Sequence, residues 1–159
     1  MYGRILLAYD GTVEGRAALR EGALLAKLCR ARVFLLSIIA ETPGSRMAET
    51  AHVGVAAHLR ERYEAVLEEG AAKLKSIGLV PEARLVIGEP AQEISAFARE
   101  IGADLVVVGH RRQSLLERWW SGSSGAYLVD NLDCSLLIGR NVISDEQFQA
   151  VLSRSNEPA

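Results

Sequence analysis

Cysteine is scarce in this chain. The two thiols, Cys29 and Cys134, lie far apart, and no C-x-x-C pair occurs anywhere in the sequence. Such spacing excludes the paired thiols that are typical of a redox motif or a zinc site. We interpret both cysteines as reduced side chains that pack like small apolar residues.

Long hydrophobic runs are also missing. The longest one, residues 33–40, is interrupted by Ser37 and is far shorter than the roughly 20 residues needed to cross a bilayer. Residues 1–4 lead straight into a predicted strand and lack the apolar stretch of a signal peptide. We therefore expect a cytoplasmic protein with no membrane partner.

Neither sign of charge dominates the sequence. Eighteen basic and twenty acidic residues leave a net charge of -2, so the chain as a whole lacks the basic surface that nucleic acid or an anionic membrane would attract. With 49% apolar and 24% charged residues, the composition is that of an ordinary globular protein. At 159 residues, one hydrophobic core is expected rather than two, since domains run to roughly 100–150 residues.

Strands and helices are predicted to alternate along the chain. Short runs rich in apolar and β-branched residues predict buried strands at 4–9, 33–39, 83–87, 104–109 and 135–139. Several of these runs are continuous rather than alternating, as expected where helices cover both faces of a sheet.

Apolar stripes at helical spacing, with start and stop signals, predict four helices between these strands. The first follows Thr12 as N-cap, the second ends at Gly78, the third lies between Pro90 and Gly102, and the fourth spans about 123–131. In the first two, the stripe residues are Ala18, Gly22, Leu25 and Cys29, and then Val55, Leu59, Tyr63, Val66, Gly70, Leu74 and Ile77.

This alternation predicts an α/β fold, a doubly wound five-stranded parallel sheet of order 3-2-1-4-5 with helices on both faces. Residues 1–140 would form this domain, and residues 41–54 a loop within it. Residues 141–159 lie outside the alternating pattern as a C-terminal tail, with a short helix near 145–152.

In such sheets a ligand binds beyond the carboxyl ends of the strands, where the winding reverses. With the expected order, that crevice lies between Ala8, Tyr9 and Asp10 at the end of the first strand and Gly109 at the end of the fourth.

Gly109 also opens the part of the chain that is richest in glycine and serine. Arg111 and Arg112 follow it, and Gly122, Ser123, Ser124 and Gly125 come at the start of the fourth helix. Free backbone N–H groups at a helix start bind phosphate, and the two arginines would add positive charge. A helix cap with a tight turn explains the same residues, and spacing alone leaves both interpretations open.

Spacing predicts no catalytic or metal centre. His52 and His58 are six residues apart and do not share a helical face, and no Ser-His-Asp arrangement is legible. Neither G-x-G-x-x-G nor G-x-x-x-x-G-K-[ST] occurs. The spacing of residues therefore identifies no catalytic base.

Several of these segments together resemble the universal stress protein family. They are residues 5–10, Gly88-Glu89-Pro90, the strand 105–109, the nine residues that separate Arg112 from Gly122-Ser123, and the closing run 134–138. The resemblance covers about residues 3–140. It implies a protein of a family with one branch that binds adenine nucleotides and another that does not bind ATP, commonly dimeric through the last strand.

The resemblance also implies roles for single residues. Asp10 would lie near the ribose or a phosphate-bound magnesium ion, and Ile38 beside the base. Gly109, Gly122, Ser123 and Ser124 would surround the phosphates. Residue chemistry alone leaves open that Asp10 only braces the first turn and that Ile38 is a core residue.

The chain departs twice from the ATP-binding pattern, which reads G-x-x-G, nine residues, G-[ST], then a small or β-branched residue and another hydroxyl residue. Arg112 replaces the second glycine and Gly125 replaces the last hydroxyl residue. An arginine there resists close approach of a ligand, yet its guanidinium also neutralises phosphate.

Two functions follow. The first is a regulatory protein that binds ATP or another adenine nucleotide, with magnesium, as a homodimer paired through the exposed edge strand 135–139. The alternative is a dimeric stress-response interaction module that does not bind ATP because Arg112 closes the site. Beyond these two, an enzyme with a metabolite or nucleotide substrate stays open only because this fold hosts many chemistries. Any hydrolysis of a bound nucleotide is expected to be slow.

Overall fold

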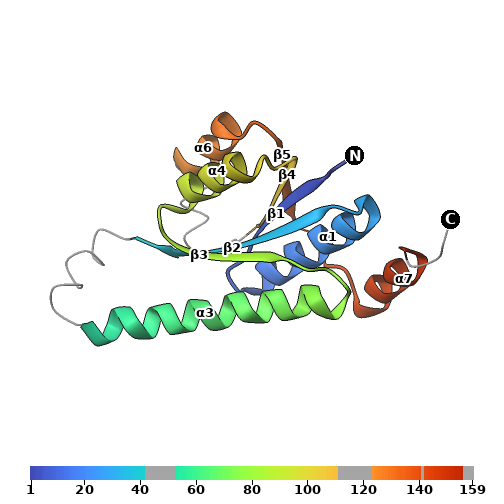
Figure 1. The fold of residues 1–159 in the computed structure, drawn as a ribbon, viewed down its shortest axis with the longest axis horizontal. Coiled ribbons are helices and arrows are strands. Elements are labelled where there is room, and N and C mark those ends of the chain that lie inside the picture. Colours follow the sequence, from blue (N-terminus) through green and yellow to red (C-terminus); the bar gives the residue numbers. More distant parts are fainter. Residues whose placement is uncertain (42–52, 111–122, 141, 156–159) are drawn as a thin grey trace.

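A computed structural model describes residues 1–41, 53–110, 123–140 and 142–155. Strands and helices alternate through these residues, as predicted (Figure 1). The strands are β1 (Arg4–Ala8), β2 (Arg32–Ala40), β3 (Glu82–Gly88), β4 (Leu105–Gly109) and β5 (Ser135–Gly139). The helices are α1 (Val13–Cys29), α3 (Val53–Ser76), α4 (Pro90–Ile101), α6 (Ser123–Asn131) and α7 (Asp145–Ser155).

The five strands form one parallel sheet of order β3-β2-β1-β4-β5. This confirms the predicted fold class. Leu6 at the centre of β1 is in register with Phe34 of β2 and Val106 of β4. Because β1 and β4 are neighbours, the carboxyl ends of these two strands open side by side.

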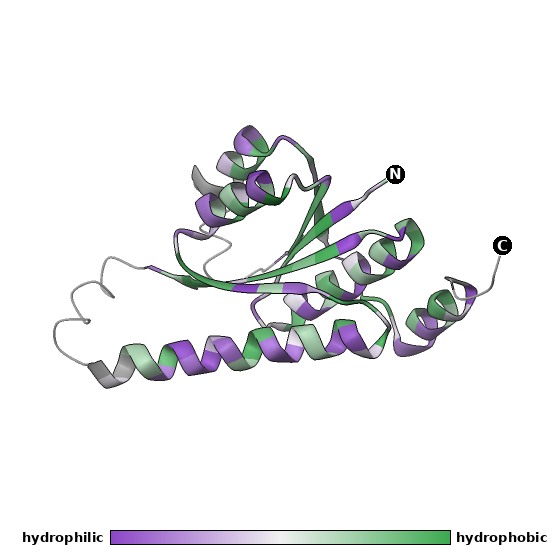
Figure 2. Cartoon of the chain, in the orientation of Figure 1, coloured by the Kyte–Doolittle hydropathy of each residue, from purple (hydrophilic) through white to green (hydrophobic). Residues whose placement is uncertain are grey.

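Helices cover both faces of the sheet. Leu7 and Leu35 point into a core shared with α1 and α3, whereas Leu6, Phe34 and Val106 point into a core shared with α4 and α6. Successive residues of one strand thus serve opposite cores, which explains why the strand sequences are continuously apolar. The strands are coloured as hydrophobic along most of their length in Figure 2.

Helix α1 packs closely because its buried face is made of small residues. The Oγ1 of Thr12 caps its start and Arg30 ends it in a left-handed conformation. A Cβ atom at Gly139 of β5 would lie only 2.6 Å from the Cα of Ala18. The centre of the buried face runs through Gly15, Ala18 and Ala26, while the predicted members Leu25 and Cys29 lie at its margin and are half-buried.

Helix α3 is the longest helix and extends beneath the sheet (Figure 1). Its predicted stop is confirmed, because Gly78 adopts a left-handed conformation with φ +81°. Burial along its apolar stripe is uneven. Gly70 and Leu74 are buried, Tyr63 and Val66 are half-buried, and Leu59 is 37% exposed.

After β5 the chain forms α7, which packs on the outer side of α1 (Figure 1). Phe148 and Leu152 of α7 enclose Leu24 of α1 in a small apolar cluster. Arg20 of α1 pairs with Asp145, and its guanidinium lies 5.1 Å from the ring centre of Phe148. Within the described residues, no helix is both long and apolar enough to span a membrane.

Candidate functional site

A crevice of about 240 Å³ lies beyond the carboxyl ends of β1, β2 and β4, where the winding of the sheet reverses. Its volume is close to the lower end of small-molecule sites, roughly 300–1,000 Å³. The described residues that line it include five of the predicted site residues, Ala8, Tyr9, Asp10, Ile38 and Gly109.

Asp10 organises the turn between β1 and α1. Its Oδ1 accepts hydrogen bonds from the backbone N–H of Thr12 at 3.0 Å and from the Thr12 hydroxyl at 2.6 Å. The Oγ1 of Thr12 in turn accepts from the backbone N–H of Gly15 at 3.0 Å. Asp10 therefore braces the start of α1, and it also lines the crevice.

The N-terminus of α1 faces the crevice, which the sequence interpretation did not include. Thr12, Glu14 and Gly15 all line it. A helix N-terminus carries a partial positive charge and unpaired backbone N–H groups. This end of the crevice therefore favours an anion, although the carboxylates of Asp10 and Glu14 add negative charge.

Gly109 is a glycine because the main chains of β4 and α1 touch at this point. A Cβ atom on Gly109 would lie 3.0 Å from the carbonyl carbon and oxygen of Glu14 and from the backbone nitrogen of Gly15. This contact closes the floor of the crevice.

The opposite side of the crevice is apolar. Ile38 and Ala40 come from β2, Pro90 and Ile94 from α4, and Val108 from β4. Next to Ile38, the buried Ser37 hydroxyl donates to the Tyr9 carbonyl at 2.7 Å, which ties the ends of β1 and β2 together. The crevice thus joins apolar side chains of β2, α4 and β4 to polar groups at the end of β1 and the start of α1.

Tyr9 contributes differently from the other predicted residues. Its side chain is 2% exposed and packs in the core on the α3 face. There its hydroxyl lies near Arg16 and Glu69, and burial raises the pKa of this phenol above its usual value. We therefore assign the Tyr9 side chain a packing role, although the residue lines the crevice.

The phosphate segment predicted from the sequence is only partly described. Ser123, Ser124 and Gly125 are the first three residues of α6, so a helix does begin where expected. Arg111, Arg112 and Gly122 lie outside the described residues.

Sequence reasoning missed the contribution of α3. Arg62, Tyr63 and Val66 of this helix also line the crevice. Tyr63 and Val66 stood in the predicted apolar stripe, but the spacing of a stripe does not tell which part of a long helix lies over the sheet and which part beyond it.

Metal-ligating side chains do not converge within the described parts of the chain, where no group of three His, Cys, Asp or Glu side chains is placed to hold an ion. His58 is exposed and lies 3.7 Å from Glu61 on the same helix. His110 directly follows β4 and is half-buried.

Comparison with known proteins places this geometry in context. Residues 1–140 match the model of the universal stress protein family. The universal stress protein YxiE of Bacillus subtilis is 30% identical over 148 residues, which cover 88% of this chain and 100% of that protein.

Two solved structures share the fold. A universal stress protein of Archaeoglobus fulgidus in complex with dAMP is 19% identical, with a TM-score of 0.63 over 87% of this chain and 98% of that one. A universal stress protein in complex with cAMP is 20% identical, with a TM-score of 0.62 over 87% of this chain and 97% of that one.

Proposed function

The chain belongs to the universal stress protein family, and we propose that it is a regulatory protein whose crevice binds an adenine nucleotide, ATP foremost. The observation that carries this proposal is the crevice itself. It joins the apolar side chains of Ile38 and Ile94 to the polar ends of β1 and β4 in one space of about 240 Å³.

Each part of a nucleotide meets a suitable surface in this proposal. The base lies against Ile38 and the neighbouring apolar side chains at β2. Its ribose lies near Asp10, and its phosphates extend past Gly109 toward the N-termini of α1 and α6, where free N–H groups bind anions. In the segment after Gly109, we propose phosphate contacts for Arg111, Arg112, Gly122, Ser123, Ser124 and Gly125.

The choice of an adenine nucleotide rests on the family's solved structures. Two of them hold dAMP and cAMP, which differ in the sugar and in the phosphate linkage and share the adenine. We extend this class of ligands to ATP with magnesium. Asp10 is the carboxylate that would face a magnesium ion bound to the phosphates. We propose regulation rather than catalysis, with hydrolysis at most slow, in the cytoplasm.

We further propose that the protein is a homodimer paired through β5. Ser135 donates its backbone N–H to Asp104 and Gly139 accepts from His110 on the β4 side. The intervening Leu136 and Ile138 then direct their backbone groups to the outer edge, because the groups of successive strand residues alternate in direction. An apolar edge strand with unpaired groups invites pairing with a second copy.

Calorimetric titration tests nucleotide binding. We expect saturable heat with ATP, and Ile38→Arg is expected to abolish it by filling the crevice. Ile87→Arg is the matched control, because Ile87 lies on the edge strand β3 with 49% of its surface exposed. Absence of heat from the wild-type protein with ATP, ADP and AMP at high protein concentration, with and without magnesium, would overturn the proposal.

A further inference from the structure

We propose that one turn of α3, carrying Arg62 and Tyr63, forms the wall of the crevice that contacts the nucleotide base. This inference rests on the proposed function, which does not include α3. It assigns base recognition to a helix on the opposite face of the sheet from α4 and α6.

The position of α3 is fixed by its contacts with the sheet. A Cβ atom on Gly70 would lie 2.7 Å from ring atom Cδ1 of Tyr9 and 3.2 Å from Leu35. Four residues nearer the N-terminus than Gly70, at Val66, the helix meets the turn after β1, since a Cβ atom on Gly11 would lie 3.0 Å from a Val66 methyl group. Both ends of this stretch are therefore held closely, Gly70 against the Tyr9 ring and Val66 against the turn that follows Tyr9.

Tyr63 lies on the same face of α3, one turn before Val66 and two turns before Gly70. Seven residues of helix correspond to about 10 Å, so Tyr63 lies well toward the carboxyl ends of the strands. Helical side chains also tilt toward the N-terminus of their helix, which carries the ring of Tyr63 further in the same direction. This accounts for a tyrosine from the α3 stripe lining the crevice.

The burial of α3 fits this placement. Leu74 is 1% exposed, Tyr63 is half-buried and Leu59 is 37% exposed. The stripe of apolar residues thus continues past the part of the helix that the sheet covers. A half-buried aromatic ring in the crevice that Ile38 and Ala40 also line offers the flat apolar surface on which a base stacks.

Arg62 has no ion-pair partner among the residues that the structure describes. The positions three and four residues before and after it carry no carboxylate, so the helix supplies no ion pair. Within the described residues no hydrogen bond or salt bridge of Arg62 is found, whereas its neighbour Arg60 bonds Glu64 at 3.0 Å. Arg62 lines the crevice, and a guanidinium stacked on the face of a base adds a cation–π contact.

The test compares ATP with adenosine, which lacks phosphate. Replacing Tyr63 by alanine is expected to lower the affinity for ATP and the affinity for adenosine by the same factor. That factor is about tenfold or more, as for loss of a stacked aromatic side chain. Tyr63→Phe keeps the ring face and is expected to stay within about twofold of wild type. Arg62→Ala, a change at an exposed position, is expected to lower both affinities severalfold. Arg60→Ala is the matched control and is expected to leave both affinities unchanged.

The outcomes separate this inference from the proposed function. If wild-type protein binds ATP and both Tyr63→Ala and Arg62→Ala leave the two affinities unchanged, the base wall is wrong while nucleotide binding stands. If these variants lose affinity for ATP but not for adenosine, the inference is also overturned, because that result would place α3 at the phosphates. A wild-type protein that binds neither ligand would overturn both proposals.

Discussion

Gly70 of α3 lies against the ring of Tyr9, and a Cβ atom at position 70 would come within 2.7 Å of its Cδ1 atom and 2.9 Å of its Cε1 atom. The ring is buried between the sheet and the helix and has little room to move. This contact sets the distance between α3 and the end of β1, and with it the width of the crevice.

Gly70→Ala is therefore expected to destabilise the protein. Overpacking of a well-packed core lowers the free energy of unfolding by roughly 1–3 kcal/mol. The better helix propensity of alanine offsets up to about 1 kcal/mol of this loss. We expect a net loss of up to about 2 kcal/mol in the free energy of unfolding, measured by urea denaturation. Gly54→Ala on the same helix is the control, because a Cβ atom there would have nothing within 4 Å; equal stability of the two variants would contradict the contact.

Acid sensitivity should depend on Glu69. Hydrogen bonds from Arg16 at 3.0 Å and Lys73 at 2.6 Å lower the pKa of this carboxyl from 4.5 to about 2. Because the pKa of Glu69 is lower in the folded state than in the unfolded one, its contacts with Arg16 and Lys73 stabilise the protein above about pH 4.5. This stabilisation is lost as the pH falls toward about 2. The side chains are partly exposed, so the contribution is at most about 1 kcal/mol.

Glu69→Gln is expected to narrow the difference in unfolding free energy between pH 6 and pH 3. Glu64→Gln, which removes the partner of Arg60 on the exposed side of the same helix, serves as the comparison. If Glu69→Gln and wild type lose equal stability on acidification, Glu69 is not held in this pair in solution.

Arg112→Gly distinguishes the two functions that the sequence left open. This change restores the glycine of the G-x-x-G pattern. If Arg112 contacts phosphate, ATP affinity should fall severalfold, as for loss of one charge-assisted contact, and adenosine affinity should not change. A gain of ATP binding in the variant over a wild type that lacks it would instead show that Arg112 closes the site.

Dimerisation should depend on the outer edge of β5. Leu136→Pro removes a backbone N–H that the alternation along β5 directs away from β4, and proline is tolerated on an edge strand. We expect sedimentation to show a dimer for wild type and a folded monomer for the variant at micromolar concentration. A monomeric wild type, or a dimeric variant, would contradict pairing through this edge.

The parts of the structure that follow from local pattern could be predicted from the sequence. Apolar runs at β1 and β4 and the cap at Thr12 identified their elements to within a residue or so. The sheet order placed Asp10 and Gly109 at one crevice, because parallel strands bring their carboxyl ends to the same edge.

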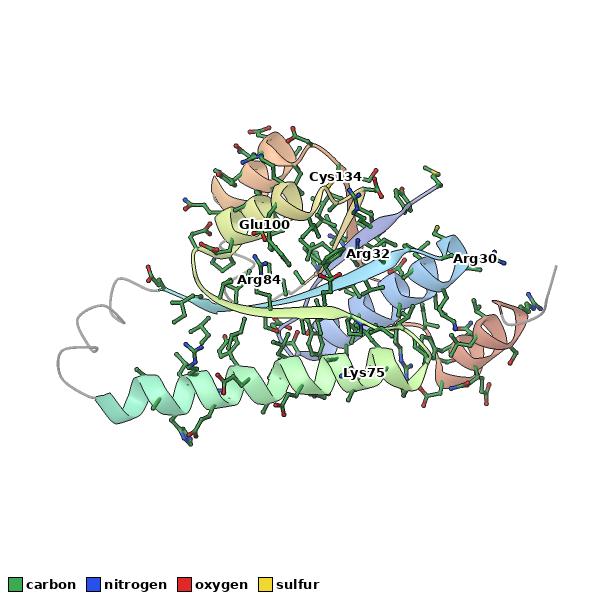
Figure 3. The ribbon with its side chains drawn as sticks, in the orientation of Figure 1. Arg30, Arg32, Lys75, Arg84, Glu100 and Cys134 are labelled. Atoms are coloured by element: carbon green, nitrogen blue, oxygen red, sulfur yellow. The ribbon has the colours of Figure 1, made fainter. Side chains whose placement is uncertain are left out.

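Features that depend on packing between distant elements could not be predicted from the sequence. Strand alternation alone puts Ala8 and Tyr9 on opposite faces, but it does not tell that the Tyr9 ring packs against Gly70 of α3. The approach of α1 to Gly109, and the reach of Arg62 into the crevice, depend on how far one element slides along another, which no local spacing records. Arg84 of β3 similarly donates a hydrogen bond to Glu100 of α4 at 2.7 Å (Figure 3), and its guanidinium lies over the ring of Phe97. Composition alone does not predict such a contact between an edge strand and a helix.

The most direct test of nucleotide binding is a crystal structure of the protein grown with ATP and magnesium. We predict density in the crevice with the base between Ile38 and Tyr63 and the phosphates beyond Gly109. An empty crevice at saturating ATP, or a nucleotide bound elsewhere on the protein, would contradict the account.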